Sequence, residues 1–320
     1  MYSFHPFAGE GAFYKGNLHC HSTRSDGSKT PAQLADSYRQ QGYSFLALSE
    51  HNIFTDPAEF CSRDFITLPA VEWEADLVQN SGQVEYWRKT HHVHGIWDGA
   101  RPAANPIRDG EVLPRMEYRG PETAAEMCRY LNSRGLFCIY NHPLWSKTSF
   151  SDYGRLEGFA AMEIYNYSGD VANATGDASL RWDELLDMGA RLWGVAADDN
   201  HNGGWPDDSF GGYIQVKAPE LSRQAIVNAI LSGSFYASSG MELHDVFLEG
   251  RTLTVRCAPA ARIDFIAGPC ICGGASYFAK SPSGLTEAAY DCGPDNSYVR
   301  VVCTDFQGRK AWSNPFYFEP

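Results

Sequence analysis

Histidines and carboxylates occur in short clusters whose spacing suits metal binding. His19 and His21 are separated by one residue, as are His92 and His94. Residues two apart on a β-strand point to the same face, so one metal ion can bind both imidazoles of such a pair. Asp26 follows the first pair in a glycine-containing loop. A polar strand end would explain either pair alone, whereas a nearby carboxylate favours metal binding.

Further candidate ligands follow apolar segments of the sequence. Glu72 and Glu74 end one such segment, and a buried carboxylate is costly unless it is paired or binds metal. The other candidates in similar positions are His51, His142, Asp199 and His201. Imidazole nitrogens and carboxylate oxygens suit Zn²⁺, Mn²⁺ or Fe²⁺ better than Ca²⁺ or Mg²⁺. Because the candidates outnumber the three protein ligands of one catalytic zinc, the sequence predicts two or three divalent metal ions.

The elements that would position these residues alternate between strands and helices. Helices are predicted where a cap or proline begins, and glycine ends, an apolar pattern: residues 31–42, 121–134, 177–188 and 219–231. β-Branched and aromatic runs predict strands at 13–20, 43–50, 65–72, 136–141, 159–166, 191–198 and 211–217. This alternation indicates parallel βαβ units and favours a barrel related to the (β/α)₈ type. Most candidate ligands come directly after a strand, as expected at the carboxyl rim of a barrel.

The chain divides into two predicted domains. Residues 1–238 form the α/β barrel, with an irregular insertion rich in Gly, Pro and charge at 75–120. Residues 239–320 contain strand-like runs between turn residues and no convincing helix, which predicts a small all-β, sandwich-like domain.

Composition excludes several functions. With 26 Lys and Arg against 39 Asp and Glu, the formal charge is −13, which argues against the basic surface that nucleic-acid binding requires. No apolar run approaches the roughly 20 residues of a membrane span, and no signal peptide is recognisable. Nine cysteines, an odd number at irregular spacing, indicate a cytoplasmic compartment. Nucleic acid and membranes are therefore not expected as partners, and the oligomeric state stays open.

Six motifs occur in an order and spacing similar to those of the PHP family, named for polymerase and histidinol phosphatase: LHCHSTRSDG, ALSEHN, PAVEWE, HHVH, YNHP and ADDNH. The resemblance covers residues 13 to about 205. It implies a distorted (β/α)₇ barrel, a TIM-like fold, with the small all-β domain after it. The ending at residues 305–315 looks like that of the carbaryl-hydrolase-like branch.

The resemblance also implies a trinuclear metal site. At the matching positions, the first ion would be bound by His19, His21, Glu72 and Asp199. Glu72 would bridge to a second ion, which His142 and one histidine of the 91–94 cluster would also bind. The third would be bound by Asp26, His51 and His201.

Two positions depart from the family pattern or leave a choice. Glu50 stands where the family usually has Asp, and it would orient a ligand from further away. Counting back from the following strand favours His94 as the ligand of the histidine cluster, whereas one branch of the family has its histidine at the position of His92.

The function implied is hydrolysis of a small phosphomonoester or phosphodiester by a hydroxide that bridges two metal ions. Arg24 and Lys147 lie within five residues of ligand motifs and would contact the phosphate, although ordinary surface positions explain them equally well. Asp198, next to Asp199, is a candidate leaving-group acid or ligand-orienting residue. Carboxylester or carbamate hydrolysis on the same metal site, and a non-catalytic PHP scaffold, are the alternatives.

Four tryptophans lie within four residues of proposed ligands: Trp73, Trp97, Trp145 and Trp205. They would form the wall of a pocket for an aromatic or nucleoside moiety of the substrate. Packing around the barrel mouth is the structural alternative.

Overall fold

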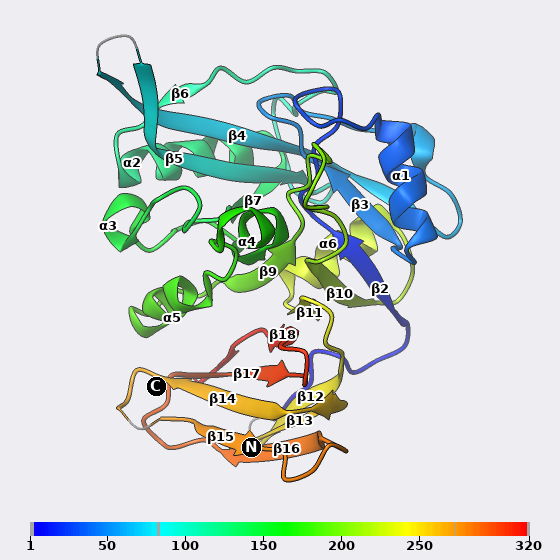
Figure 1. Ribbon diagram of the computed structural model, residues 1–320, viewed down its shortest axis with the longest axis vertical. Coiled ribbons are helices and arrows are strands. Elements are labelled where there is room, and N and C mark those ends of the chain that lie inside the picture. Colours follow the sequence, from blue (N-terminus) through cyan, green and yellow to red (C-terminus); the bar gives the residue numbers. More distant parts are fainter. Residues whose placement is uncertain (1–2, 82–83, 272, 319–320) are drawn as a thin grey trace.

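The computed structural model describes residues 3–81, 84–271 and 273–318. Figure 1 shows an α/β region formed by the chain from residue 12 to residue 238, and an all-β region below it. The predicted fold class, α/β with a small all-β region at the C-terminal side, is confirmed.

The barrel strands form within the apolar runs of the sequence. β3 and β7 are buried along their whole length, as expected of strands covered on both faces. The strands of this region are β2 (Ala12–Asn17), β3 (Phe45–Leu48), β4 (Ile66–Ser81), β5 (Val84–Trp97), β7 (Leu136–Tyr140), β8 (Ala161–Asn166), β9 (Trp193–Ala197), β10 (Tyr213–Ala218) and β11 (Phe235–Ser238).

Helices connect many of these strands and cover the barrel (Figure 1). They are α1 (Pro31–Gln40), α2 (Pro121–Ser133), α3 (Phe150–Tyr153), α4 (Tyr167–Asn173), α5 (Ser179–Asp187), α6 (Arg223–Leu231) and the 3₁₀ turn η1 (Ala58–Phe60). α1 begins with a capping box: Thr30 Oγ1 accepts a hydrogen bond from the Gln33 N–H, and Gln33 Oε1 accepts one from the Thr30 N–H. α3 and α4 are short and were not predicted.

The sheet combines parallel and antiparallel pairs. β2, β3 and β4 are parallel, as are β7, β8 and β9. Between these two groups, β5 pairs antiparallel with β4 and β7. β10 pairs antiparallel with β2 and β11. The antiparallel strands therefore distort the parallel barrel that the alternation of strands and helices predicted.

The insertion predicted at residues 75–120 is more regular than expected. β4 and β5 form a long hairpin, coloured cyan in Figure 1, and β6 (Met116–Glu117) pairs with β4. Residues 98–115 contain no helix or named strand. The expectation of an irregular segment was wrong for the hairpin, because polar residues on a solvent-facing strand have the composition of a loop.

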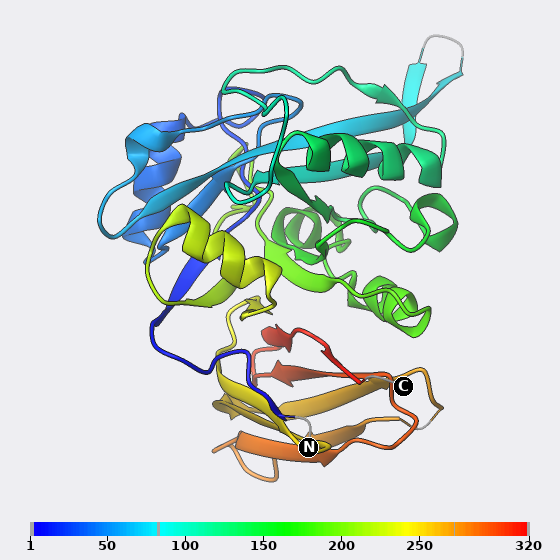
Figure 2. The same cartoon turned by 180° about the vertical axis from the view of Figure 1, so that it is seen from behind.

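The all-β region contains β1 (Ser3–Phe4), β12 (Leu243–Glu249), β13 (Thr252–Ala260), β14 (Arg262–Gly268), β15 (Ala275–Phe278), β16 (Leu285–Asp291), β17 (Tyr298–Thr304), β18 (Lys310–Ser313) and β19 (Phe316–Tyr317). β1 pairs with β12, so the first described residues lie in this region and not in the barrel (Figure 2). β11 pairs with both β10 and β18, which makes one continuous sheet from the barrel into the all-β region.

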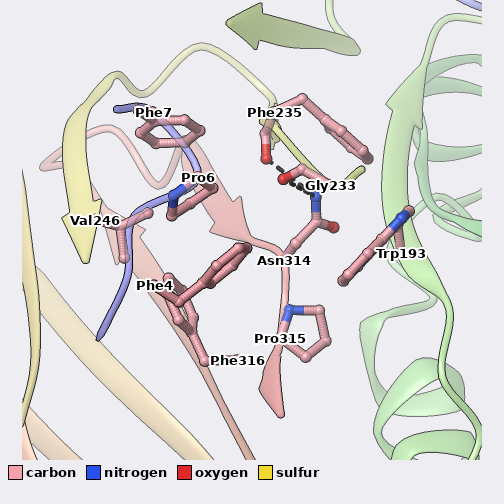
Figure 3. A pocket seen from close by; sticks show the side chains of 10 residues that line it. All are labelled: Phe4, Pro6, Phe7, Trp193, Gly233, Phe235, Val246, Asn314, Pro315 and Phe316. Carbon is pink, nitrogen blue, oxygen red and sulfur yellow. Dashed lines mark hydrogen bonds between the residues drawn. The ribbon is translucent and has the colours of Figure 1, made fainter. Parts of the chain in front are cut away.

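Polar side chains join the two regions. Arg300 of β17 is buried and donates two hydrogen bonds of 2.7 Å to Asp183 of α5. Asn314 donates to the backbone carbonyls of Gly233 and Phe235, as Figure 3 shows. The cavity beside Asn314 has a volume of only about 10 Å³, so the interface is closely packed there.

The apolar side chains form separate cores. The largest fills the barrel, a second fills the all-β region, and a third lies between α1 and β3. Within the described ranges, no helix is long and apolar enough to cross a membrane.

Candidate metal centre

The candidate ligands gather at one end of the barrel. They come from the segments just after β2, β3, β7 and β9, and from β4 and β5. A parallel bridge between Cys20 and Asn200 joins the segments after β2 and β9, and another joins His51 to Glu72. The carboxyl ends of parallel strands meet at one rim, which brings residues far apart in sequence together.

One group combines three buried residues, His19, His21 and Glu72, with the partly buried Asp199. Asp199 Oδ1 lies 2.9 Å from His19 Nε2 and 3.0 Å from His21 Nε2. Glu72 places carboxylate oxygens 3.2 Å from His19 Nε2 and 3.3 Å from His21 Nε2. The two Nε2 atoms are 3.0 Å apart. The structure thus brings together the four residues that the resemblance assigned to the first metal ion.

Glu72 is shared with further histidines. Its Oε1 lies 3.0 Å from His92 Nδ1 and 3.1 Å from His142 Nε2, and its Oε2 lies 3.2 Å from His51 Nδ1. Asn141 Nδ2 donates a hydrogen bond of 2.7 Å to Oε1 and fixes the carboxylate. Glu72 therefore places its two carboxylate oxygens among imidazole nitrogens from three further chain segments.

A more open group contains His21, Asp26, His51 and His201. Asp26 lies 3.5 Å from His51 Nε2 and 3.5 Å from His201 Nε2. The ring of His21 stacks against those of His51 and His201, with centroid distances of 4.2 and 4.4 Å, and these two rings lie 5.8 Å from each other. Asp26, His51 and His201, which the resemblance assigned to a third ion, thus lie together at the outer side of the centre.

The neighbouring charges keep the carboxylates ionised. Burial raises the pKa of Glu72, but His19 and His92 outweigh burial and hold this pKa well below its ordinary value. Burial also raises the pKa of Asp26, and His201 and His51 bring it down to about 2. Burial lowers the pKa of His201, whereas Asp26 and Asp199 raise it to about 9. A metal ion bound at His201 would displace that proton.

The carboxylates of the centre and its buried polar atoms without hydrogen-bond partners are suited to binding cations. Glu72 Oε2 and His21 Nδ1 are buried and have no hydrogen-bond partner among the described residues. Arg115, the cation beside Glu74, already pairs with Glu74 at 2.5 Å and with Asp76 at 3.2 Å. Buried polar atoms without partners cost free energy unless a ligand satisfies them. The donor set of imidazole nitrogens and carboxylate oxygens therefore fits divalent metal ions.

Glu163 of β8 accepts hydrogen bonds from candidate ligands of the centre. It was not predicted from the sequence. Its Oε1 lies 3.0 Å from His19 Nδ1, and its Oε2 accepts hydrogen bonds from the His142 N–H and from Asn166 Nδ2. An acceptor at Nδ1 favours the imidazole tautomer whose Nε2 is free to bind metal. The signal that could have found it is the one used for Glu72, a single carboxylate in an apolar strand.

Two ligand positions have strained backbone. His142 has φ of 22° and Asp199 has φ of 56°, both in the left-handed region that non-glycine residues rarely adopt. Such strain occurs where the surrounding structure holds a side chain in a functional position. For His142, the hydrogen bond from its N–H to Glu163 is one of the contacts that hold it.

The structure separates His92 from His94. His92 forms a candidate group with His51 and Glu72. The ring of His94 packs against that of His19, with a centroid distance of 4.1 Å, and its Nε2 has no hydrogen-bond partner among the described residues. Burial holds the pKa of His94 well below its ordinary value, so the ring is neutral. This geometry favours His92 as the ligand shared with Glu72, in contrast to the preference for His94 drawn from the sequence.

Asp198 points away from the centre. Its carboxylate accepts hydrogen bonds from the backbone N–H groups of residues 210–212 and from the hydroxyl of Tyr38 at 2.6 Å. The expectation that Asp198 acts on the leaving group is therefore corrected: this side chain anchors a loop. Asp199, the next residue, carries its side chain into the centre instead.

Arg24 also lies outside the centre. It pairs with Asp109 at 3.6 Å and with Glu59 at 4.0 Å, and it does not line the cavity described below. The expected phosphate contact of Arg24 is therefore corrected. Glu50 accepts a hydrogen bond of 2.5 Å from Ser25 Oγ, so it fixes the loop that carries Asp26, in agreement with an orienting role.

A cavity of about 710 Å³ opens onto the centre. Of the four tryptophans predicted to line a pocket, Trp145 does so, with its ring centroid 5.0 Å from that of His142. Trp73 is buried and donates to the Pro114 carbonyl, Trp97 packs against the barrel core, and Trp205 is 94% exposed outside the cavity. Lys147 lines the cavity, and Trp87, which sequence reasoning missed, does so from β5.

No protein-family profile matches this chain, and no curated protein matches it. Several solved structures resemble it, and three of them are described below. A two-domain protein from Bacteroides vulgatus ATCC 8482, described as containing a predicted PHP-like metal-dependent phosphoesterase, is 14% identical with a TM-score of 0.49; the match covers 92% of this chain and 92% of that one.

The other two structures match a smaller share of this chain. A protein from Bifidobacterium adolescentis ATCC 15703, named for metal-dependent phosphoesterase activity, is 16% identical with a TM-score of 0.43, over 68% of this chain and 95% of that one. An amidohydrolase from Chromobacterium violaceum, with bound sulfate and no metal, is 16% identical with a TM-score of 0.43, over 69% of this chain and 96% of that one. These values are too low to transfer an activity.

Proposed function

We propose that this protein is a metal-dependent hydrolase of the PHP type that cleaves small phosphomonoesters or phosphodiesters. One observation carries the proposal: oxygens of the buried Glu72 lie within 3.3 Å of imidazole nitrogens from His19, His21, His51, His92 and His142. A structural ion pair needs one partner, whereas a carboxylate among imidazoles from four chain segments fits a ligand shared between cations. The sequence motifs of the PHP family fall on the same residues.

We propose that the centre binds two or three divalent ions, and that these are Zn²⁺, Mn²⁺ or Fe²⁺. The separate groups of ligand atoms around Asp199, around His92 and around Asp26 support more than one ion. His21 and His51 each belong to two groups. Each of these histidines could therefore bind either of two neighbouring ions. The nitrogen and oxygen donors support the choice of metals.

The residues around the centre would set its geometry. When bound, divalent ions supply the positive charge that activates water and neutralises a phosphate ester. Asn141 and Glu163 orient ligands by hydrogen bonds, and Ser146 Oγ lies 3.0 Å from His142 Nδ1 and restrains that ring. Lys147 adds a positive charge at the cavity wall, where it would bind the substrate phosphate.

The proposal is tested by removing metal with a chelator, adding Zn²⁺, Mn²⁺ or Fe²⁺ singly, and assaying p-nitrophenyl phosphate, bis(p-nitrophenyl) phosphate and p-nitrophenyl acetate. We expect turnover of a phosphate ester that depends on added metal, and two or three ions per chain by mass spectrometry. Asp199→Asn should lose both activity and metal. His244→Ala, at an exposed histidine of β12, is the matched control and should retain both.

Two outcomes would contradict the phosphoesterase. Activity on the acetate ester alone would favour carboxylester or carbamate hydrolysis, the reaction that resemblance to the carbaryl-hydrolase-like branch implies. Less than one metal ion per chain, with no activity after metal addition, would favour a non-catalytic scaffold.

We also propose a cytoplasmic location. The cysteines in the described ranges are free, including the buried Cys128 and Cys138, which lie on adjacent elements without a disulfide. Free thiols are typical of a reducing compartment. Detection of the tagged protein in the soluble reducing fraction of its cell, with all thiols alkylatable after denaturation, tests this.

A further inference from the structure

The cavity extends beyond the metal centre along the β4–β5 hairpin. Besides the candidate ligands, it is lined by Trp87, Arg88, Lys89 and Thr90 of β5 and by Trp145 and Lys147 after β7. Its volume of about 710 Å³ is in the range of pockets that enclose an organic ligand, about 300–1,000 Å³. A phosphate alone would fill only a small part of it.

A β-bulge interrupts β5 where this strand lines the cavity. Leu77 pairs with Lys89, but the next residue, Val78, pairs with Trp87, which leaves Arg88 as an extra residue in β5. In a regular strand, Trp87 and Arg88 would point to opposite faces. A bulge breaks this alternation, and residues 87–90 all contribute to the cavity wall.

Two cations of the cavity wall are free to bind a ligand. Lys89 donates to Asp152 at 2.7 Å, and Arg115 pairs with Glu74 and Asp76. Carboxylates of the protein therefore already neutralise the charges of Lys89 and Arg115. In the described part of the chain, neither Arg88 nor Lys147 pairs with a carboxylate, and both are exposed on the cavity wall. The free positive charges fit an anionic group in addition to the reacting phosphate.

Two indole rings lie at different distances from the centre. The Trp145 ring is 5.0 Å from that of His142 and 5.6 Å from that of His92, so it lies beside the position of the reacting group. Trp87 is 74% exposed at the far end of the cavity wall. At about 3.3 Å per strand residue, Arg88 and Trp87 lie roughly 13 and 16 Å beyond His92.

We infer that this part of the cavity is a leaving-group subsite, and that it selects elongated phosphate esters with an aromatic ring next to the phosphate and a negative charge about 10 Å further on. Trp145 contacts the ring, Arg88 binds the distal charge, and Trp87 covers that end. Lys147 contacts the reacting phosphate. The inference rests on the proposed phosphoesterase activity, because the subsite is placed relative to the proposed ligands.

The test compares three substrates on the metal-loaded protein: ethyl phosphate, biphenyl-4-yl phosphate and 4′-carboxybiphenyl-4-yl phosphate, with released phosphate as the readout. We expect kcat/KM to rise in that order. Arg88→Gln should raise KM for the carboxylated ester about tenfold, the loss of one charge-assisted hydrogen bond, with kcat and the other two substrates unchanged. Arg155→Gln, at an exposed arginine outside the cavity, is the matched control.

The aromatic contact is tested in the same way. Trp145→Leu should lower kcat/KM for both biphenyl esters more than for ethyl phosphate, whereas Trp205→Leu, at a tryptophan outside the cavity, should change none of the three values. Equal kcat/KM for the three substrates in the wild type, or equal effects of a variant and its control, would overturn the inference.

The proposed function and the subsite can fail separately. Turnover of ethyl phosphate without discrimination among leaving groups would refute the subsite alone. If no ester is hydrolysed, the proposed function fails, and calorimetric binding of 4′-carboxybiphenyl-4-ylphosphonate then tests the subsite directly. Weaker binding to Arg88→Gln than to Arg155→Gln would support it, and equal binding would overturn it.

Discussion

Two of the places where charged side chains are buried in this protein differ in their surroundings. At the interface between the barrel and the all-β region, Arg300 and Asp183 form one pair of opposite charges through two hydrogen bonds, and Arg300 Nη1 has no partner among the described residues. At the barrel rim, the buried Glu72 has several imidazole neighbours and an oxygen without any hydrogen-bond partner among the described residues. The interface therefore holds a single ion pair, whereas the rim gathers imidazoles and carboxylates from several chain segments.

This difference distinguishes charged residues that stabilise the fold from charged residues that bind a ligand. In a buried pair of opposite charges, each charge compensates part of the desolvation cost of the other, so removing one partner leaves the other uncompensated. Carboxylates and imidazoles that face a common point leave lone pairs unused, and a cation offsets their repulsion. Changes at the interface should therefore affect the free energy of unfolding, and changes at the rim should affect metal binding and activity.

The largest effect is expected from Glu72→Gln, which keeps the size of the side chain and removes its charge. The kcat/KM for phosphate esters should fall by about 10³-fold or more, as for groups that act as a unit, and bound metal should fall with it. Thermal unfolding of the metal-free variant should occur at a lower temperature than that of the metal-free wild type, because the imidazoles that hold the pKa of Glu72 below its ordinary value lose their carboxylate partner. Unchanged metal content and rate would contradict the bridging role.

Arg300→Met should reduce stability and leave metal binding and activity unchanged. Removing one partner leaves Asp183 without its buried cation, which should lower the free energy of unfolding by about 3–5 kcal/mol in denaturant titrations. Metal content and kcat/KM at a temperature where the variant is folded should be unchanged. Arg262→Met, in an exposed pair with Asp264, is the control and should cost less than about 1 kcal/mol. Equal losses in the two variants would show that burial of the Arg300 pair is not decisive.

Glu163→Gln tests a residue that is buried at the rim without being a proposed bridging ligand. We expect the affinity for metal to fall about 10–100-fold, because His19 loses the acceptor that fixes its tautomer. Competition with a fluorescent chelator measures this. Glu184→Gln, on the exposed face of α5, should leave the affinity unchanged. If both variants bind metal like the wild type, Glu163 does not position a ligand.

The smallest effect is expected at the partly exposed pair between Lys310 of β18 and Asp177. Burial raises the pKa of Asp177, but the hydrogen bond from Lys310 outweighs burial and lowers this pKa below its ordinary value. A carboxyl group with a lower pKa in the folded state adds stability above its unfolded pKa, and this stability is lost as the pH falls through the folded pKa.

Lys310→Met should therefore weaken the fall of the melting temperature between about pH 5 and pH 3, by an amount equivalent to about 1 kcal/mol or less. Thermal unfolding at a series of pH values measures it, with metal content as the control. An identical pH dependence in the wild type and the variant would show that the pair contributes nothing measurable.

The candidate ligands that follow apolar strands could be predicted from the sequence. His19, His51 and His142 follow strands β2, β3 and β7, and parallel strands bring such positions to one rim. The resemblance to the PHP family then predicted which of these residues would bind the same metal ion. The structure then brought His19, His21, Glu72 and Asp199 together as the resemblance implied.

Other features depended on contacts that no local pattern encodes. The choice between His92 and His94 depends on how far β5 extends along the barrel, which the register of the β4–β5 hairpin sets. Asp198 and Asp199 are chemically alike, but the loop at residues 210–212 binds the first and leaves the second for the centre. Glu163 could have been suspected from its apolar strand, but its two partners in the centre, His19 and His142, are more than 20 residues away along the chain.

Strand β11 determines whether the barrel can be separated from the all-β region by truncating the chain. Because β11 pairs with β10 on one side and β18 on the other, a chain ending at residue 238 would keep the whole metal centre but leave the backbone N–H and C=O groups of β11 unpaired along one edge. Exposed edges of this kind recruit strands from other molecules. The barrel would then be an aggregating fragment, and the smallest folding unit that can keep the centre in solution includes both regions.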